Sequence, residues 1–394
     1  MRTKIVLRSG KDQSLRRYHP WVFSGAIKKI YGPLSEGDVV DVEDNKGEFL
    51  GMGHYAPGSI AIRIISFSRV DADRDFWKQR FVAAYLMRKE MKLAGNPETN
   101  AWRLVYGEGD LLPGLIIDYY AGMLVMQFHS VGMYRQRERF AELLREIMGD
   151  EIIGIYDKSA ATLPFKADIK PRDEWLYGKK QKEAEVLEYG NHFLVNWTEG
   201  QKTGFFLDQR ENRKLIRRLS KGKEVLNLFG YTGGFSVYAL RGGASHVDTV
   251  DSSRKAIDLS KINAEINFGK DAPHRGIVAD AFDYLEKSGN NYDLIILDPP
   301  AFAKHNNVLP NALQGYKRLN EKAFRKIRPG GIIMTFSCSQ VVSRENFRKS
   351  VFVAAANAGR EVKILFQLSQ PPDHPVNIFH PEGEYLKGLV LRVG

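Results

Sequence analysis

The chain has 394 residues, of which 43% are hydrophobic and 27% charged, and its formal net charge is +11. This composition is that of a folded globular protein, and at ~100–200 residues per domain the length predicts about two or three domains. No apolar run approaches the ~20 residues that cross a bilayer, and the N-terminus has no hydrophobic segment followed by a cleavage site, so we expect a cytoplasmic protein without a membrane anchor.

Residues 1–70 alternate short β-type runs with turn signals, which predicts a small all-β domain. Residues 1–31 carry eight Lys or Arg against one acid, Asp12. Such clustering is typical of a surface that binds a phosphate backbone, although a solvated basic surface has the same composition. The candidates for RNA binding are Arg2, Lys4, Arg16, Arg17, Lys28 and Lys29, with Tyr18, Phe23 or Trp21 available to stack on bases unless they belong to the β core.

The central segment, residues 71–190, mixes helical and β-type periodicities, which predicts an α+β domain. Its expected elements are helices over 73–93 and 134–148, a hairpin turning at Ala121-Gly122, a strand over 151–157 and a hairpin turning at Gly190-Asn191.

The last segment, residues 191–394, alternates seven β-type runs with helical segments from about residue 205 onward. This βαβ rhythm predicts an α/β domain with an open, mainly parallel sheet and helices on both faces. The last two runs, 363–368 and 385–393, leave no room for a full crossover helix. We therefore expect the last strand to insert antiparallel at the edge of the sheet.

The expected parallel strands end in Gly or Asp. The first runs into Phe229-Gly230-Tyr231-Thr232-Gly233, and the next three end near Asp251, Asp280 and Asp298. Ligands of such sheets bind beyond the carboxyl ends of the strands, where glycines let the backbone approach a ligand and an acid can bind ribose hydroxyls. The loop lacks the G-x-G-x-x-G spacing of a dinucleotide site, which disfavours hydride transfer.

This order of a Gly-rich loop, an acid, Asp-Ala and Asp-Pro-Pro resembles the class I S-adenosylmethionine (SAM)-dependent methyltransferases. The resemblance implies that residues 227–234 line the methionine part of SAM, that Asp251 binds ribose and that Asp280 lies against adenine. Asp298 would face the methyl-transfer centre. The implied SAM-binding residues of these loops are Asn227, Phe229, Gly230, Tyr231, Thr232, Gly233, Asp251, Ser252, Asp280, Ala281, Asp298 and Pro299.

Asp298-Pro299-Pro300 is compatible with methylation of an exocyclic amine of adenine or guanine. In amino-group methyltransferases such a turn presents polar groups to the amine, and an aromatic residue stacks on the flipped base. Here Ala301 occupies the aromatic position, and Phe302 follows it.

Cys338 indicates a different chemistry. It is the only cysteine, so it has no partner for an intrachain disulfide, and the sequence shows no metal-ligand spacing. It follows the expected fifth strand, on the ligand side of the sheet. A thiolate there could add to carbon 6 of a pyrimidine and activate carbon 5 for methylation. The alternative is an inert packing thiol.

The chain as a whole resembles the RlmI-type large-subunit ribosomal RNA cytosine-C5 methyltransferases. The segments that carry this resemblance are His19-Pro20-Trp21-Val22-Phe23, 107–118, 199–210, 226–240, 297–304, 335–339, 373–376 and 381–388. The resemblance implies a PUA-like RNA-binding domain over 1–70, a central α+β domain over 71–190 and a Rossmann-like seven-stranded methyltransferase domain over 191–394. It implies Cys338 as nucleophile, with Asp298 beside it, and ribosomal RNA or its assembly intermediate as partner.

The resemblance also places Phe206, Asp208 and Arg210 around the SAM pocket. Without it, Phe206 could pack under the sheet and Asp208 could cap the following helix. Members of that family commonly carry Lys where Ala301 stands, and Lys304 is the nearest cation in the segment. An alternative function remains open, namely an RNA-binding factor without enzymatic activity. A homodimer is also possible, although the sequence contains no motif for it.

Overall fold

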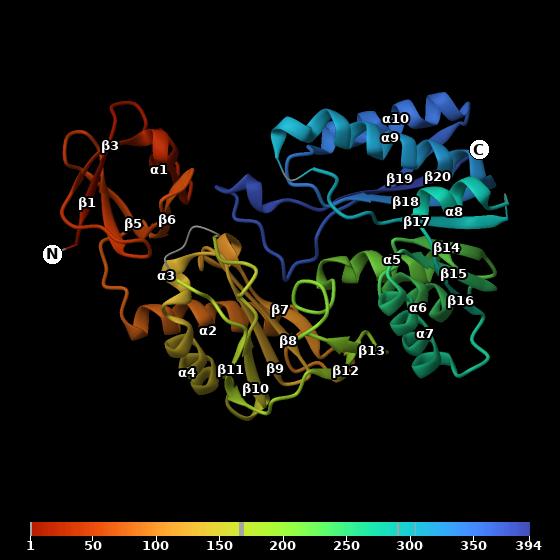
Figure 1. Cartoon of the computed structure of the whole chain (residues 1–394), viewed down its shortest axis with the longest axis horizontal. Coiled ribbons are helices and arrows are strands. Elements are labelled where there is room, and N and C mark those ends of the chain that lie inside the picture. Colours follow the sequence, from red (N-terminus) through yellow and green to blue (C-terminus); the bar gives the residue numbers. More distant parts are fainter. Residues whose placement is uncertain (1, 165–168, 290, 304) are drawn as a thin grey trace. The chain divides into compact units, whose positions relative to one another are not determined.

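The structure is a computed structural model that describes all residues except 1, 165–168, 290 and 304 (Figure 1). The chain forms two compact units, and each contains segments that are distant in sequence. The first unit consists of Met1–Leu187, Val195–Leu207 and Pro372–Gly383. The second unit consists of Glu188–Leu194, Asp208–Pro371 and Glu384–Gly394.

The first unit begins with a small β domain. Its elements are β1 (Lys4–Leu7), α1 (Gln13–Arg16), β2 (Trp21–Phe23), β3 (Ile27–Tyr31), β4 (Val39–Glu43), β5 (Phe49–Tyr55) and β6 (Ile60–Ser66). The strands form one sheet in the order β2-β6-β5-β4-β1-β3. Alternate apolar residues, such as Ile5 and Leu7 of β1 and Val40 and Val42 of β4, fill one core because successive side chains of a strand face opposite sides.

The rest of the first unit is a five-stranded sheet with helices. Its elements are α2 (Arg74–Glu90), β7 (Ala101–Tyr106), β8 (Leu115–Tyr120), β9 (Met123–Phe128), α3 (Val131–Tyr134), α4 (Arg137–Met148), β10 (Gly154–Asp157) and β11 (Glu174–Gly178), and the strand order is β11-β10-β9-β8-β7. Trp77 and Phe81 of α2 and Phe140 of α4 join Trp102 of β7 in one apolar core. The helices therefore pack on the sheet through large aromatic side chains.

A separate hairpin follows, made of β12 (Glu183–Glu188) and β13 (Asn191–Asn196). Its turn residues are Tyr189 and Gly190, with φ of 48° and 71°. The predicted turn at Gly190-Asn191 is wrong by one residue, because Asn191 already begins β13 and its amide side chain donates to the Glu188 carbonyl oxygen at 3.1 Å.

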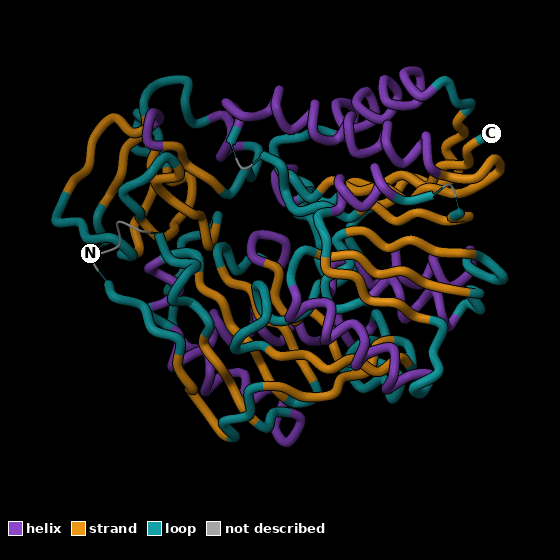
Figure 2. The backbone as a smooth tube through the Cα atoms, turned by 45° about the vertical axis from the view of Figure 1, so that its right-hand side comes forward, coloured by secondary structure: helices purple, strands orange, loops and turns teal. Residues whose placement is uncertain are grey.

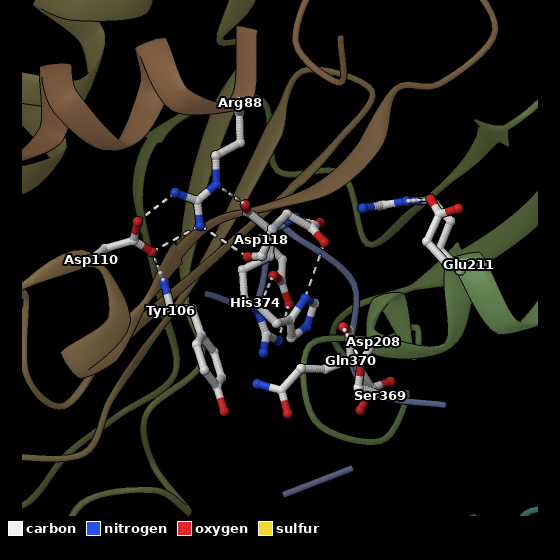
Figure 3. A network of polar contacts seen from close by, with 12 residues as sticks. Arg88, Tyr106, Asp110, Asp118, Asp208, Glu211, Ser369, Gln370 and His374 are labelled. Carbon is white, nitrogen blue, oxygen red and sulfur yellow. Dashed lines mark hydrogen bonds and ion pairs between the residues drawn. The ribbon is translucent and has the colours of Figure 1, made fainter. Parts of the chain in front are cut away.

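A buried polar network lies in the first unit around Arg88 (Figure 3). The Arg88 guanidinium pairs with both carboxylate oxygens of Asp110, and its Nη2 also donates to the carbonyl oxygen of Asp373 at 2.9 Å. The Asp373 carboxylate accepts from the Arg103 backbone N–H at 2.9 Å. The segment Pro372–Gly383 is thus held in this unit by buried polar contacts.

The second unit has an α/β fold built on a seven-stranded sheet (Figure 2). Its strands are β14 (Glu224–Leu228), β15 (His246–Asp251), β16 (His274–Val278), β17 (Tyr292–Leu297), β18 (Ile327–Ser337), β19 (Val362–Leu368) and β20 (Lys387–Val393). The order is β16-β15-β14-β17-β18-β20-β19. The first five are parallel, and β20 runs antiparallel to both β18 and β19, as expected. The expected position of the last strand at the sheet edge is wrong, because β20 inserts between β18 and β19 and leaves β19 as the edge strand.

Helices cover both faces of this sheet (Figure 1). They are α5 (Arg210–Leu219), α6 (Gly234–Arg241), α7 (Arg254–Phe268), α8 (Ala281–Lys287), α9 (Leu309–Lys326) and α10 (Arg344–Ala358). Ile216 of α5 and Phe235 of α6 belong to one apolar core, whereas Leu285 of α8, Tyr316 of α9 and Phe347 of α10 belong to the other. In the described part of the chain, no helix combines the length and the apolar composition that crossing a membrane requires.

Candidate functional site

The candidate site lies where the parallel strands of the second unit end. Strand order reverses at β14, which pairs with β15 on one side and β17 on the other. Leu228 at the end of β14 pairs with Val250 of β15 and with Leu297 of β17, and Leu297 pairs with Thr335 of β18. The loops that follow these four strands therefore lie side by side at one sheet edge, the position where open α/β sheets bind ligands.

The loop after β14 has an unusual backbone. Phe229 and Tyr231 have φ of 57° and 45°, a left-handed conformation that non-glycine residues rarely adopt, and Gly233 has φ of 78°. A Cβ on Gly230 would lie 2.4 Å from Cγ2 of Thr249, so no larger residue fits there without displacement. Backbone strain of this kind concentrates at ligand sites, and it is consistent with a loop shaped to approach a ligand closely.

Asn227 is the penultimate residue of β14, directly before this loop, and is fully buried. Its Nδ2 donates to Ser236 Oγ at 2.8 Å, and Ser236 Oγ lies 2.6 Å from Thr249 Oγ1. Within the described residues, Asn227 Oδ1 has no hydrogen-bond partner. Such an orphaned buried acceptor usually has a partner in the functional state, so Asn227 offers an acceptor for a donor that enters from the loop side.

Asp251, at the end of β15, holds the same loop. One carboxylate oxygen accepts from the Tyr231 N–H at 3.0 Å and the other accepts from the Ser253 N–H at 2.9 Å. An ionised carboxylate has about four lone-pair positions, so acceptor capacity remains for two vicinal hydroxyls. Ser252 beside it is exposed. These acceptor positions fit the two hydroxyls of a ribose ring.

Asp280 lies after β16 and caps helix α8. Its Oδ1 accepts from the backbone N–H groups of Phe282 at 2.8 Å and Asp283 at 3.1 Å. The residue is exposed, whereas Ala281 is buried. Asp280 thus has a structural role as the N-cap of α8. This role was not predicted from the sequence, because α8 itself was not predicted. The exposed carboxylate is compatible with a ligand beside it.

Asp298 follows β17 and is half-buried. Its Oδ1 accepts from Gln209 Nε2 at 3.0 Å, and Gln209 Oε1 accepts from Asn212 Nδ2 at 2.7 Å. Gln209 and Asn212 thus position the carboxylate. Their role was not predicted from the sequence, although Gln209 adjoins Asp208 in the segment 199–210.

Asp208 and Arg210 flank the start of α5. Asp208 Oδ2 accepts from the Tyr385 hydroxyl at 2.5 Å, and Arg210 is fully buried. The third residue of that group, Phe206, belongs to the first unit, where the Lys202 ammonium lies 5.1 Å from its ring centroid. It is therefore not among the residues that the second unit brings together.

Cys338 directly follows β18 and is half-buried. Its Sγ donates to the carbonyl oxygen of Pro299 at 3.6 Å, which places the thiol against the Asp-Pro-Pro turn after β17. The neighbouring backbone is fixed, because the carbonyl oxygen of Ser339 accepts from Lys387 Nζ at 2.6 Å. The arrangement brings a thiol and the Asp298 carboxylate to adjacent strand ends.

The ring of Phe302 packs against Tyr316 of α9, with centroids 4.7 Å apart. The aromatic residue that follows the Asp-Pro-Pro turn therefore has a partner within the protein. Lys304 lies outside the described residues. No group of three or more His, Cys, Asp or Glu side chains in the described ranges is arranged to hold a metal ion.

The basic candidates of the first unit fall into two groups. Arg2, Lys4 and Arg16 each pair with acids of the same unit; Lys4, for example, lies 2.9 Å from Glu43. Arg17, Lys28 and Lys29 are exposed. The charge of the first group is largely compensated within the unit, so the second group is the better candidate for phosphate binding.

The aromatic candidates also differ. Tyr18 and Phe23 are 53% and 48% exposed. Trp21 is half-buried, and its Nε1 donates to Glu108 Oε1 at 2.7 Å. Tyr18 and Phe23 thus offer ring surface to a ligand, whereas the Trp21 indole N–H is already used within the unit.

The chain matches two protein-family models. The model of S-adenosylmethionine-dependent methyltransferases matches residues 108–391, and the model of PUA-like domains matches residues 5–67. The chain is 40% identical over 401 residues to the "Ribosomal RNA large subunit methyltransferase I" of Aeromonas hydrophila, with 100% of both chains covered. It is 39% identical over 399 residues to the protein of the same name from Tolumonas auensis, again with 100% of both chains covered.

Two solved structures are similar along almost the whole chain. A Streptococcus mutans protein assigned to the SAM-dependent methyltransferases superimposes with a TM-score of 0.84, at 26% identity and 99% coverage of both chains. A second structure, of a protein assigned as a methyltransferase and complexed with SAH, superimposes with a TM-score of 0.85 at the same identity and coverage.

Proposed function

Because the chain belongs to the SAM-dependent methyltransferases, in the family of the ribosomal RNA large subunit methyltransferase I proteins, we propose that it methylates carbon 5 of a cytosine in large-subunit ribosomal RNA. The family models confirm the predicted PUA-like and methyltransferase domains and SAM as the cofactor. The observation that carries the carbon-5 assignment is Cys338 at the end of β18, with its Sγ 3.6 Å from the Pro299 carbonyl oxygen.

Within the second unit, the residues around the sheet edge fit SAM. The strained loop 229–233 admits a ligand against its backbone, Asp251 retains acceptors for ribose hydroxyls, and Asp280 with Ala281 would border the adenine. Bound SAM supplies an electrophilic methyl group. The chain's part is to hold the donor beside the turn at Asp298 and to exclude water there.

Cys338 supplies the nucleophile. Its thiolate adds to carbon 6 of the pyrimidine, which places electron density on carbon 5, and carbon 5 then accepts the methyl group. Loss of the carbon-5 proton to a base restores the carbon 5–carbon 6 double bond and expels the thiolate. Asp298, held by Gln209, lies at the neighbouring strand end, where it can orient the target cytosine by accepting a hydrogen bond from the exocyclic amine of that nucleobase.

The test is nucleoside mass spectrometry of ribosomal RNA from a strain that lacks this protein, before and after incubation with purified protein and SAM. A gain of 5-methylcytidine is the expected product. A methylated adenine or guanine instead would move the chemistry to Asp298 and its turn, as in amino-group methyltransferases. Binding of SAM without any methylation of naked RNA or of isolated subunits would count against an enzymatic role.

Replacing Asp251 by Ala is expected to weaken SAM binding by about 10- to 100-fold. The change removes a charge-assisted hydrogen bond to ribose, worth ~1.5–3 kcal/mol, and releases the Tyr231 backbone that shapes the loop. Calorimetric titration with SAM measures the effect, with Asp258→Ala on the exposed face of α7 as the matched control. Equal affinities for the two variants would show that Asp251 does not contact the cofactor.

The exposed basic residues of the first unit provide a prediction about RNA. The double variant Arg17→Glu, Lys28→Glu is expected to bind ribosomal RNA more weakly and to show a smaller salt dependence of binding, because each lost phosphate contact lowers the slope by about one. Filter binding over a range of salt concentrations measures both quantities. Lys221→Glu, an exposed residue of the second unit, serves as control. An unchanged slope would place the RNA surface elsewhere.

A further inference from the structure

Lys387 is a buried lysine beside the proposed nucleophile. It is the first residue of β20, where it pairs with Ser337, the last residue of β18. Cys338 follows Ser337 directly. The Lys387 side chain is turned toward this strand end, because its Nζ donates to the carbonyl oxygen of Ser339 at 2.6 Å. Lys387 is only 3% exposed.

Burial of an ammonium is costly unless an opposite charge or several acceptors compensate it. Among the described residues, Lys387 forms no ion pair with a carboxylate, and the Ser339 carbonyl oxygen is its hydrogen-bond acceptor. Burial lowers the pKa of Lys387 to about 8, and the charge of Cys338 acts against this shift. The ammonium therefore persists at neutral pH, and a thiolate at Cys338 is an available counter-charge.

The other charged groups near Lys387 do not replace that counter-charge. Arg344 of α10 lowers the pKa of Lys387 and Glu384, before β20, raises it. These two residues pair with each other, since the Arg344 guanidinium donates to Glu384, and Arg344 also donates to the Leu368 carbonyl oxygen at 3.2 Å. Their charges largely cancel, which leaves Cys338 as the group that changes charge beside Lys387.

We propose that the Lys387 ammonium stabilises the thiolate of Cys338, which makes Lys387 a positioning residue for the nucleophile. The catalytic role of this pairing rests on the proposed carbon-5 methylation. The electrostatic pairing itself requires only Lys387 and Cys338. An ammonium near a thiolate favours the ionised form, and a low local dielectric strengthens this attraction. The pairing thereby raises the share of Cys338 in its reactive thiolate form before RNA binds.

The test uses the fact that Cys338 is the only cysteine of the chain. Iodoacetamide alkylates the thiolate with loss of iodide, so the alkylation rate of the full-length protein against pH reports the ionisation of this one thiol. In Lys387→Met we expect the midpoint of that profile to rise by about one pH unit, which slows alkylation at pH 7 by about tenfold. Lys387→Arg, which keeps the charge, should retain most of the wild-type rate.

Lys363→Met on the neighbouring strand β19 is the matched control, because Lys363 is exposed and its removal should leave the profile unchanged. Circular dichroism and SAM titration verify that each variant is folded. An identical profile for wild type and a folded Lys387→Met variant would overturn the proposal. If that variant does not fold, a wild-type midpoint at or above the ~8.5 of an ordinary thiol overturns it as well.

The proposal and the proposed function can fail separately. A midpoint shift in Lys387→Met together with a methylated purine as product would support the pairing of Lys387 with Cys338 and contradict its role in cytosine methylation. Formation of 5-methylcytidine with an unshifted profile would remove Lys387 alone. If both hold, kcat of Lys387→Met should fall about tenfold at pH 7 and recover as pH rises, while KM for SAM stays unchanged.

Discussion

Replacing Cys338 by Ala is expected to abolish methyl transfer, with a fall in kcat of at least about 10³-fold, because carbon 5 of a cytosine does not accept a methyl group without nucleophilic addition at carbon 6. Affinity for SAM should remain within about twofold, since most of the residues implied to bind the cofactor lie in the loops after β14, β15 and β16, with Asp298 and Pro299 after β17. Transfer of a tritiated methyl group to ribosomal RNA measures the first quantity and calorimetry measures the second.

Cys338→Ser is the matched variant, because it keeps the volume and a hydrogen-bond donor toward the Pro299 carbonyl oxygen. A hydroxyl is a far weaker nucleophile than a thiolate, so this variant should be as inactive as Cys338→Ala. Full activity of either variant would contradict the covalent mechanism. If Asp298→Ala were then inactive, methylation of an exocyclic amine would account for the activity.

Replacing Arg88 by Met is expected to lower the free energy of unfolding of the first unit by about 3–5 kcal/mol. Arg88 is fully buried, so its loss leaves the Asp110 carboxylate without its counter-charge and removes the hydrogen bond to the Asp373 carbonyl oxygen. Tryptophan fluorescence during denaturant unfolding is a suitable measurement, because all five tryptophans of the chain belong to this unit.

Arg74→Met is the control for this experiment, since Arg74 lies on the same helix α2 and forms an exposed ion pair with Glu146 of α4. Such exposed pairs contribute about 0–1 kcal/mol. Equal losses of unfolding free energy in the two variants would mean that the Arg88 network stabilises the first unit no more than an exposed ion pair does.

Much of the second unit could be predicted from the sequence because its signals are local. Apolar strands, glycines and acids follow one another at short spacing, so the mainly parallel sheet and the strand ends at Asp251, Asp280 and Asp298 are evident without coordinates, whereas the order of the strands is not. Helix α8 was missed for a physical reason. Its N-cap, Asp280, is also a candidate ligand residue, and only 7 residues of helix follow it.

Long-range contacts could not be predicted. The pairing of Arg88 with Asp110 and the Asp373 carbonyl oxygen joins residues up to 285 positions apart, and nothing in the local sequence around Asp373 indicates it. Lys387 is similar, because an isolated lysine at the start of a strand is ordinarily exposed and only the register of β18 with β20 buries it beside Cys338. The roles of the individual site residues and of the basic surface remain predictions.

The segment Pro372–Gly383 has a consequence for the order in which the protein can be built. The first unit contains the start of the chain, but it is complete only when this segment, near the end, has been added. At ~5–20 residues per second, a ribosome needs on the order of tens of seconds to extend the chain by the 285 positions from Arg88 to Asp373. Until then the nascent first unit lacks one acceptor of its buried arginine, so its native packing is reached late in translation or after it.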